Sequence, residues 1–508
     1  MAIPAAETIK NDQLNTDEII EIINPITMQT IAQRDNLSPK AVSERVQKAR
    51  EAQKAWAETP VKERARIIQR WKALMWENQE ELVRLIREST GKVRAGALIE
   101  VWVTDSLSQY YIHNAAKILK PRKRKALFPV VQHVQTIYKP YGVVGVISPW
   151  NYPLLLTLLD AIPALFAGNA VLMKPSEITP LAIEYAVKLM HEAGLNEHLV
   201  QVIIGDGSTG AALVDQVDYI SFTGSTAVGR KIAVRAAERL IPCSLELGGK
   251  DPAIVLKDAN LDLSAASVLR GAIENAGQVC MSIERTYVEA EIYDEFIQKI
   301  EDFTRDINLG TGDDIKVHVG SMTNEIEIKR TENHIKDAVE KGARVIYGGK
   351  RRPDLGPRFF EPTVLVDVDH SMLIMQEETF GPTLPIMKVK DAQEAVKLAN
   401  DSKYGLAASI FSKDLKQAEN LAKLIETGDV TINRTQMVIG TASTPSGGVK
   451  QSGLGRRNGP EGLLKYTSMQ SIITDNNLGQ TPNLSLLDPL TIKAFLILRK
   501  IRKYIPFI

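Results

Sequence analysis

The sequence predicts an α/β fold built on a doubly wound parallel sheet. From Gly142 onward, short apolar strands alternate with helical stretches, a pattern that indicates a parallel sheet with helices on both faces. The chain has 508 residues, 44% of them hydrophobic, and single cores stop growing near about 250 to 300 residues. We therefore expect two or three domains, and the architecture that begins at Gly142 is typical of nucleotide binding.

The expected elements follow in chain order. The stretch 39–92 has the periodicity of charged, solvent-facing helices, and Gly91 supplies a helix stop. A basic cluster at 121–125 precedes a segment whose partial alternation suggests an extended ribbon. The strands of the first sheet are expected in GVVGVISP, AVLMKP, VQVIIG and YISFTGS. A second set begins near Asp251, in PAIVL, TYVEA, ARVIYGG, TVLVDV, PIMKV and GDVTIN, and predicts a second α/β domain.

Composition excludes several classes of protein. Lys and Arg number 62 and Asp and Glu number 61, so there is no basic field that would hold nucleic acid. The two cysteines lie far apart and have no spacing typical of a disulfide framework or a zinc site. The first twenty residues contain no signal-peptide-like apolar run, and no stretch approaches the roughly 20 apolar residues of a membrane-spanning helix. We expect a cytoplasmic protein without a metal site.

Two motifs are candidates for nucleotide binding. Gly224 to Gly229 joins a strand to a helix, where glycines let the backbone approach a phosphate and the helix N-terminus favours an anion. The spacing is not GxGxxG, so an ordinary tight turn is an equal alternative. Lys174 and Glu177 follow the strand AVLM, where they could bind ribose hydroxyls or phosphate, or be surface charges.

Two further residues are candidates for catalysis. Cys280 lies in ENAGQVCMS, between an apolar helix and the strand ERTYVEA, whereas Cys243 has the surroundings of a structural cysteine. Glu246, in LELGGK, is flanked by apolar residues and glycines, which would raise the pKa of its carboxyl group and suit it to proton abstraction.

Together these segments resemble the aldehyde dehydrogenase superfamily in its hydrolytic, NAD(P)-dependent form, from the N-terminal helices to about Ile473. Seven motifs stand in the order and approximate spacing of the family: PWNYP (149–153), KPSE (174–177), FTGST with Gly229 (222–229), LELGGK (245–250), GQVC (277–280), EETFGP (377–382) and SGGVKQSGLGR (446–456).

The resemblance implies a role for each matching residue. Cys280 would be the nucleophile, Glu246 the general base and Asn151 the oxyanion donor. The residues that match cofactor contacts are Trp150, Lys174, Glu177, Gly224, Ser225, Gly229, Glu378 and Phe380. We expect NAD as the cofactor, because the Glu177 carboxylate would repel a 2′-phosphate, with NADP as the alternative.

The resemblance also implies a domain organisation. A Rossmann-like cofactor-binding domain would comprise 1–120 and 142–247, and a catalytic domain 248–445. Strands at 121–141 and 465–477 would form a small β extension for oligomerisation. A homodimer or homotetramer is expected.

The implied mechanism has two stages. The Cys280 thiolate attacks an aldehyde, and the Asn151 amide and the Cys280 backbone N–H stabilise the oxyanion of the thiohemiacetal. Hydride transfer to the nicotinamide leaves a thioester, which water activated by Glu246 hydrolyses to the carboxylate. Relatives that transfer the acyl group to coenzyme A generally lack this glutamate, so hydrolysis is expected.

The substrate is less determined than the reaction. Leu156 and Leu159 lie where similar enzymes wall the substrate tunnel, which favours an aliphatic or otherwise apolar aldehyde. The chain departs from the family at Ser446, where an aromatic residue is usual, and at Arg457, where an acidic residue is usual. The alternatives are a semialdehyde acid such as succinate semialdehyde, a sugar-phosphate aldehyde, and an inactive structural relative.

The C-terminal tail, 484–508, lies beyond the family motifs. After Asp488 it has no acidic residue, and it combines five cations with many apolar side chains. Its longest uncharged apolar run, 494–498, is too short to span a bilayer. We expect it to lie in the interface of an anionic membrane, and the alternative is that it packs on the body or on a neighbouring subunit.

Overall fold

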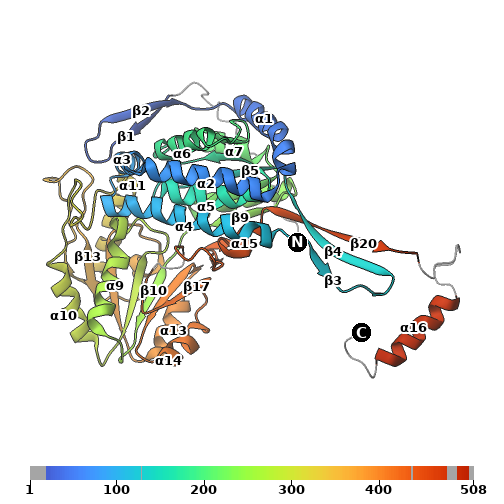
Figure 1. Ribbon diagram of the computed structural model, residues 1–508. Helices are drawn as coiled ribbons and strands as arrows, with labels where there is room; N and C mark the ends of the chain where they lie inside the picture. Colours follow the sequence, from blue (N-terminus) through green and yellow to red (C-terminus); the bar gives the residue numbers. More distant parts are fainter. Residues whose placement is uncertain (1–18, 128, 436–438, 478–488, 503–508) are drawn as a thin grey trace, which may run out of the picture. The chain divides into compact units, whose positions relative to one another are not determined.

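The computed structural model describes residues 19–127, 129–435, 439–477 and 489–502 (Figure 1). The chain divides into two compact units. The first contains 1–119 and 139–468, and the second contains 120–138 and 469–508. Both large sheets belong to the first unit.

The first sheet has six strands in the order β19-β9-β8-β5-β6-β7. From β9 to β7 all neighbouring pairs are parallel, whereas β19 pairs antiparallel with β9. Its strands are β5 (Val143–Ile147), β6 (Ala170–Lys174), β7 (Val200–Val202), β8 (Tyr219–Thr223), β9 (Cys243–Glu246) and β19 (Gly453–Leu454). Almost every residue of β5, β6 and β8 is buried, as expected for a parallel sheet covered on both faces.

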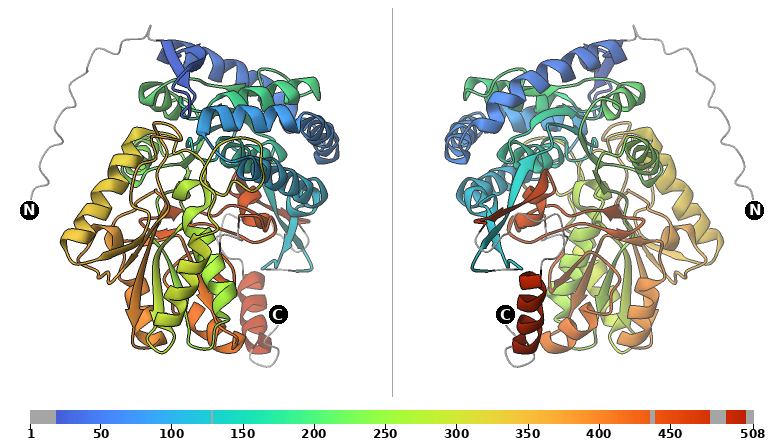
Figure 2. Two further views of the ribbon diagram at one scale, coloured as in Figure 1. Left: turned by 90° about the vertical axis from the view of Figure 1, so that its left-hand side faces the viewer. Right: turned by 90° about the vertical axis from the view of Figure 1, so that its right-hand side faces the viewer.

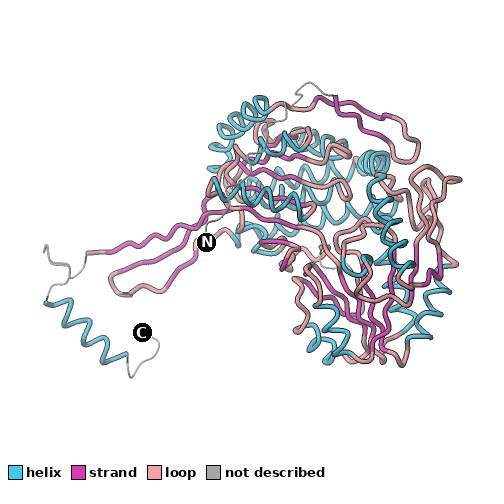
Figure 3. The backbone as a smooth tube through the Cα atoms, turned by 180° about the vertical axis from the view of Figure 1, so that it is seen from behind, coloured by secondary structure: helices cyan, strands magenta, loops and turns pink. Residues whose placement is uncertain are grey.

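Helices connect these strands and cover the sheet, as Figure 3 shows in cyan around magenta strands. They are α5 (Pro153–Phe166), α6 (Leu181–Glu192), α7 (Gly207–Val214) and α8 (Thr226–Glu238). α5 is buried along its whole length and has Pro153 at its first position, where a missing N–H costs nothing. α8 begins after Ser225, whose hydroxyl accepts a hydrogen bond from Val228 N and caps the helix.

The second sheet has seven strands in the order β12-β13-β14-β11-β10-β16-β17. Only β12 runs antiparallel to its neighbour. The strands are β10 (Asp251–Val255), β11 (Ile283–Glu289), β12 (Arg344–Tyr347), β13 (Thr363–Val366), β14 (Thr383–Val389), β16 (Ala407–Phe411) and β17 (Asp429–Ile432). The helices of this half are α9 (Leu261–Ile273), α10 (Tyr293–Thr304), α11 (Glu325–Glu340), α12 (Leu373–Gln376), α13 (Ala392–Asn400) and α14 (Leu415–Ala422). The two sheets have separate cores, and the doubly wound α/β fold class is confirmed.

N-terminal helices complete the first core (Figure 2). They are α1 (Pro39–Glu58), α2 (Val61–Glu77), α3 (Gln79–Thr90) and α4 (Arg94–Ile118). Gly91 ends α3 in the left-handed conformation, φ 77°, as the sequence predicts. A hairpin of β1 (Ile19–Ile23) and β2 (Thr30–Asp35) precedes them. The short strand β15 (Tyr404–Gly405) comes just before β16, and β18 (Val449–Lys450) and α15 (Gly459–Leu464) follow β17.

The second unit contains a three-stranded sheet in the order β20-β4-β3. Its strands are β3 (Arg122–Arg124), β4 (Gln132–Pro140) and β20 (Thr467–Asp475). The two segments predicted as oligomerisation strands therefore pair with each other, although their role in assembly stays a prediction. α16 (Pro489–Arg502) follows β20, and no helix in the described residues is long and apolar enough to span a membrane.

Candidate active site

The site lies at the carboxyl ends of the first sheet, where open α/β folds bind ligands. β8 ends at Thr223 and β9 at Glu246, and Gly224 N donates to the Glu246 carbonyl oxygen at 3.1 Å. Three cavities meet in this region. We call them the polar cavity (about 470 Å³), the small cavity (about 20 Å³) and the apolar cavity (about 680 Å³).

Cys280 lines all three cavities. It follows a tight turn in which Asn275, Ala276 and Gly277 have φ of 52°, 55° and 72°. A Cβ on Gly277 would lie 2.0 Å from the Gly381 carbonyl oxygen, so only glycine fits there. The turn places the thiol where it can be reached from each cavity.

Electrostatics keep the Cys280 thiol protonated. Burial raises the pKa of Cys280 to about 12, and the carboxyl groups of Glu378, Asp251 and Glu246 act in the same direction. The Arg457 guanidinium opposes them only in part. Nucleophilic attack by Cys280 therefore requires a base that takes up its proton.

Glu246 lies beside Cys280 in both the polar and the small cavity. Burial raises the pKa of Glu246 to about 7, against the pull of the Arg457 and Lys465 cations. One carboxylate oxygen accepts a long hydrogen bond from Gly448 N at 3.4 Å, and the other has no partner among the described residues. A carboxyl group with this pKa can take up and release a proton near neutral pH.

Asn151 lines the polar cavity beside Cys280 and is 2% exposed. Its Nδ2 donates to the Gln278 carbonyl oxygen at 2.9 Å. Because a primary amide has two N–H donors, this bond fixes the amide and leaves the second donor for a ligand.

Most of the predicted cofactor residues surround the polar cavity. Trp150 and Phe380 meet edge to face with their ring centroids 5.5 Å apart, and both line the cavity together with Gly224, Ser225 and Glu378. Burial raises the pKa of Glu378 to about 8, and its carboxylate accepts a hydrogen bond from Gly249 N at 3.1 Å. Nearby cations are Arg230, Arg330 and Lys403.

Three predicted cofactor residues do not line this cavity. Lys174 is buried and pairs with Glu177 at 3.4 Å, and neither side chain is part of the cavity wall. Gly229 serves packing, because a Cβ there would lie 2.4 Å from a methyl group of Leu247. Its absence of a side chain lets α8 approach the segment after Glu246.

The apolar cavity is bounded by residues of three helices, of the cysteine turn and of the segment that follows β17. Its apolar members are Ile99, Trp102, Val103, Leu155, Leu156, Val279, Met281 and Ile439. Arg270, Glu274 and Arg434 are its charged members. Leu156 lines all three cavities, whereas Leu159 lines only the small one.

The unusual Arg457 takes part in a buried cluster beside Glu246. Its guanidinium pairs with Asp160 at 2.5 Å and donates to Thr223 Oγ1. Lys465 and the Tyr466 hydroxyl also bind the Asp160 carboxylate, at 2.8 Å and 2.7 Å. Although burial opposes it, the two cations hold the pKa of Asp160 below its ordinary value. This cluster brings positive charge near the general-base candidate.

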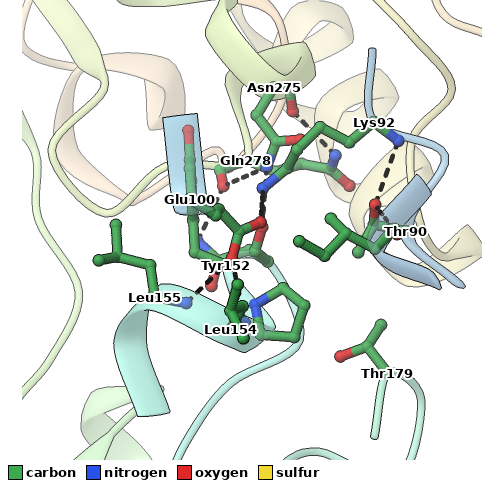
Figure 4. A network of polar contacts seen from close by, with 12 residues as sticks. Thr90, Lys92, Glu100, Tyr152, Leu154, Leu155, Thr179, Asn275 and Gln278 are labelled. Carbon is green, nitrogen blue, oxygen red and sulfur yellow. Dashed lines mark hydrogen bonds and ion pairs between the residues drawn. The ribbon is translucent and has the colours of Figure 1, made fainter. Parts of the chain in front are cut away.

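Sequence reasoning missed a set of buried polar residues behind the site (Figure 4). They include Lys92, Glu100, Asn275 and Gln278, which hydrogen-bond to the Asn151 segment or to one another. Lys92 comes directly after a helix stop, where a charged residue is ordinarily exposed. No signal in the sequence marks these residues as buried.

The chain is similar in sequence to known proteins. Residues 12–472 match the model of the aldehyde dehydrogenase family. A Mycobacterium ulcerans protein named as a succinate-semialdehyde dehydrogenase [NADP(+)] is 46% identical over 90% of this chain and 88% of its own length. A Methylomonas protein named 4,4'-diapolycopene aldehyde oxidase is 40% identical over 91% of this chain and 87% of its own.

Solved structures have the same fold. Betaine aldehyde dehydrogenase from Staphylococcus aureus, determined in complex with NAD+, matches with a TM-score of 0.87 and 35% identity, covering 92% of this chain and 93% of that one. An aldehyde dehydrogenase from Brucella matches with a TM-score of 0.87 and 34% identity, covering 90% and 94%. The chain therefore belongs to the aldehyde dehydrogenase family.

Proposed function

We propose that this NAD(P)-dependent oxidoreductase oxidises its aldehyde through a covalent intermediate on Cys280. The observation that supports this role is the position of Cys280, which lines the polar and the apolar cavity at once. A nucleophile there can be reached by an aldehyde from one side while a cofactor occupies the other. Absorbance of the reduced nicotinamide, followed with a panel of aldehydes, tests the reaction.

The polar cavity fits a dinucleotide. Ser225 and the N-terminus of α8 offer backbone amides to a phosphate. The Glu378 carboxylate can accept hydrogen bonds from ribose hydroxyls, and Trp150 and Phe380 provide aromatic walls. When bound, NAD(P) supplies a hydride acceptor.

Glu246 is proposed as the base of both stages. The Cys280 thiol, with its raised pKa, must lose a proton as sulfur attacks the carbonyl carbon, and the Glu246 carboxylate borders the same cavities. Before the second stage Glu246 releases this proton to water, which its pKa of about 7 permits. It then takes a proton from the water that attacks the thioester and passes it to the leaving sulfur, which regenerates the Cys280 thiol, while the acid product loses its own proton to solvent and leaves as the carboxylate. The Asn151 amide and the Cys280 N–H stabilise the negative oxygen in each stage.

The apolar cavity supports an aliphatic or otherwise apolar aldehyde as substrate. Most of its lining is apolar, and it includes Leu155, Leu156 and Met281, which are close in sequence to Asn151 and Cys280. The names of the relatives disagree about the substrate, and the mycobacterial name favours a semialdehyde acid. Arg270 and Arg434 could bind the second carboxylate of such a substrate.

A series of aldehydes distinguishes these alternatives. For an apolar substrate, kcat/KM should rise with chain length from propanal to decanal, by about 0.8 kcal/mol, or roughly fourfold, for each buried methylene. Succinate semialdehyde should be a poorer substrate than pentanal. The reverse order, with loss of succinate semialdehyde activity in Arg270→Gln or Arg434→Gln, would establish the semialdehyde acid instead.

The second unit is proposed to mediate assembly. Exposed apolar side chains gather on its strands and their connection, among them Leu127, Val130, Met469 and Ile473. A homodimer or homotetramer would cover such groups. Light scattering should give a mass of two or four chains, and Ile473→Glu should reduce it.

We also propose that α16 binds anionic membranes peripherally. Its exposed side chains include the apolar Ile492, Phe495, Leu496, Ile497 and Ile501 and the cations Lys493, Arg499 and Lys500. Each cation near an anionic surface contributes about 1 kcal/mol. The full chain should sediment with anionic liposomes, a chain ending near Gln480 should not, and salt should weaken binding. Equal behaviour of both proteins would refute membrane binding through α16.

A further inference from the structure

The helix α5, which begins two residues after Asn151, is capped from another helix. α5 has no side-chain cap of its own at Tyr152. Instead, Glu100 of α4 accepts hydrogen bonds from Leu154 N and Leu155 N, both at 3.1 Å (Figure 4). A carboxylate at this place satisfies unpaired amides and complements the helix dipole.

Lys92 joins this cap to the backbone of Asn151. Its ammonium group donates to Glu100 Oε1 at 2.5 Å and to the Asn151 carbonyl oxygen at 2.8 Å, and it lies 3.5 Å from the centroid of the Tyr152 ring. The side chains of Lys92 and Glu100 are both 0% exposed. One buried ion pair thus contacts Asn151, Tyr152, Leu154 and Leu155.

The same network reaches the cysteine turn. The Asn151 carbonyl oxygen also accepts from Asn275 Nδ2 at 3.2 Å, and the Gln278 carbonyl oxygen accepts from Asn151 Nδ2 at 2.9 Å. Gln278 in turn is held through its side chain, which donates to Asn275 O and accepts from Thr323 N. Both proposed oxyanion donors, the Asn151 amide and the Cys280 N–H, therefore adjoin one connected set of bonds.

Stability alone gives little reason for such a pair. Removing two charges from water costs several kcal/mol for each ion, and apolar replacements of buried pairs are often neutral or stabilising. Fixed donor geometry does give a reason, because donors aimed in advance at a developing charge lower the barrier.

We propose that Lys92 and Glu100 are positioning residues that fix the oxyanion donors of the reaction. The inference rests on the proposed roles of Asn151 and Cys280. The pair acts at a distance from the reacting atoms. It holds the start of α5 and the turn before Cys280 in fixed positions relative to each other.

A second buried pair provides a matched control on the other side of the site. Lys250 donates to Glu284 at 2.6 Å, with side chains 0% and 3% exposed. Glu284 accepts from Thr379 N and Phe380 N, so this pair holds the segment of Glu378 and Phe380 beside the polar cavity. We expect its loss to affect the cofactor first.

The test compares two double variants, Lys92→Met/Glu100→Gln and Lys250→Met/Glu284→Gln. Each removes both charges, so neither leaves a single buried ion. In Lys92→Met/Glu100→Gln, the rate of the first burst of reduced cofactor should fall about 100-fold, the usual scale for misplaced catalytic groups, while the Kd of the cofactor stays unchanged. In Lys250→Met/Glu284→Gln, we expect a higher Kd of the cofactor than in the wild type. Equal burst rates in wild type and the Lys92 pair variant would overturn the proposal.

A mutant cycle with Asn151→Ala separates positioning from general destabilisation. If Lys92 and Glu100 act through the oxyanion donors, replacing them in the Asn151→Ala background should slow the burst by much less than about 100-fold. A further decrease of about 100-fold in the burst rate would refute the positioning role. Should the double variant not fold, Lys92→Met alone leaves Glu100, whose pKa burial raises, to become a neutral carboxyl group that keeps an acceptor for α5, and it should still slow the burst. A burst of wild-type rate and size in Cys280→Ser would instead refute the assignment of Cys280.

Discussion

The two large cavities on either side of Cys280 differ in their chemistry. The polar cavity presents charged and hydrogen-bonding groups, such as Glu378, Arg330 and Lys403, whereas the apolar cavity presents mainly hydrocarbon and one indole, Trp102. Polar groups at fixed positions select a ligand by its hydrogen bonds, while apolar walls select by size and shape. The difference indicates strict recognition on the cofactor side and graded recognition on the substrate side.

Removing the group shared by both cavities should have the largest effect. Cys280→Ser is expected to lower turnover roughly 10,000-fold or more, the scale on which nucleophile loss acts in other enzymes, because a hydroxyl is far less nucleophilic. Binding of the cofactor, measured by fluorescence titration, should be nearly intact. Cys243→Ser is the control and should retain the chemistry. Wild-type turnover in Cys280→Ser would refute covalent catalysis.

Glu246→Gln should separate the two stages in time. A general base contributes about 100- to 10,000-fold, so hydrolysis of the thioester should slow by that order. Rapid mixing should then show up to one equivalent of reduced cofactor, formed more slowly than in the wild type because the Cys280 thiol has also lost its base, followed by a still slower phase. Complete loss of the burst with normal cofactor binding would show that activation of Cys280, rather than hydrolysis, limits the variant, and wild-type turnover would refute the role of Glu246 as a base.

The pH dependence has a definite sign. Burial raises the pKa of Glu246 to about 7, and only the carboxylate can take a proton from water. The hydrolysis rate of the wild type should therefore rise with pH up to about 7 and level off above it. In Glu246→Gln this rise should be absent.

The variant Trp102→Ala tests whether the apolar cavity binds the hydrocarbon chain of the aldehyde. Loss of apolar contact worth about 1 kcal/mol should lower kcat/KM for decanal about fivefold and leave propanal and the cofactor Kd unchanged. Trp76→Ala is a matched control, because Trp76 is also exposed, at 47%, and lines none of the three cavities. An equal loss for both aldehydes would mean that Trp102 does not contact the distal chain.

The smallest effect is expected at Glu177. If its carboxylate repels a 2′-phosphate with about 1 kcal/mol, Glu177→Gln should narrow a preference for NAD over NADP by about fivefold. Glu192→Gln, which removes the carboxylate of an exposed ion pair with Lys188 at 3.8 Å, should leave the NAD preference unchanged. Better kcat/KM with NADP in the wild type would contradict the NAD preference, and the mycobacterial relative is named for NADP(+).

Much of the fold could be predicted from local patterns. The run AVLM is apolar throughout and YISFT is mostly apolar, since both faces of their strands are covered, and they form β6 and β8. The strand β9, which bears Glu246, was not predicted, because its polar and ionisable residues do not form an apolar run. The hairpin of β1 and β2 also was not predicted, because nearly all of its residues are exposed or half-buried and its pairing leaves no clear apolar pattern.

The candidate site shows more clearly that local patterns do not predict contacts between distant parts of the chain. Motifs identified Cys280, Glu246 and Asn151, which line one cavity. They could not show that Lys92 reaches Asn151 from 59 positions away, because burial of a charge depends on tertiary partners rather than on neighbours in the chain. Nor could they show that Arg457 pairs with Asp160 across 297 positions.

The turn before Cys280 bears on attempts to engineer this protein. Left-handed backbone costs an L-residue about 1 to 2 kcal/mol, and Asn275 and Ala276 both adopt it. Selection for heat resistance would tend to relieve that cost, for example with glycine at Ala276, and the backbone of Cys280 would gain freedom as a result. Thermostability and turnover should therefore compete at this turn, and variants improved in one property are best screened for the other.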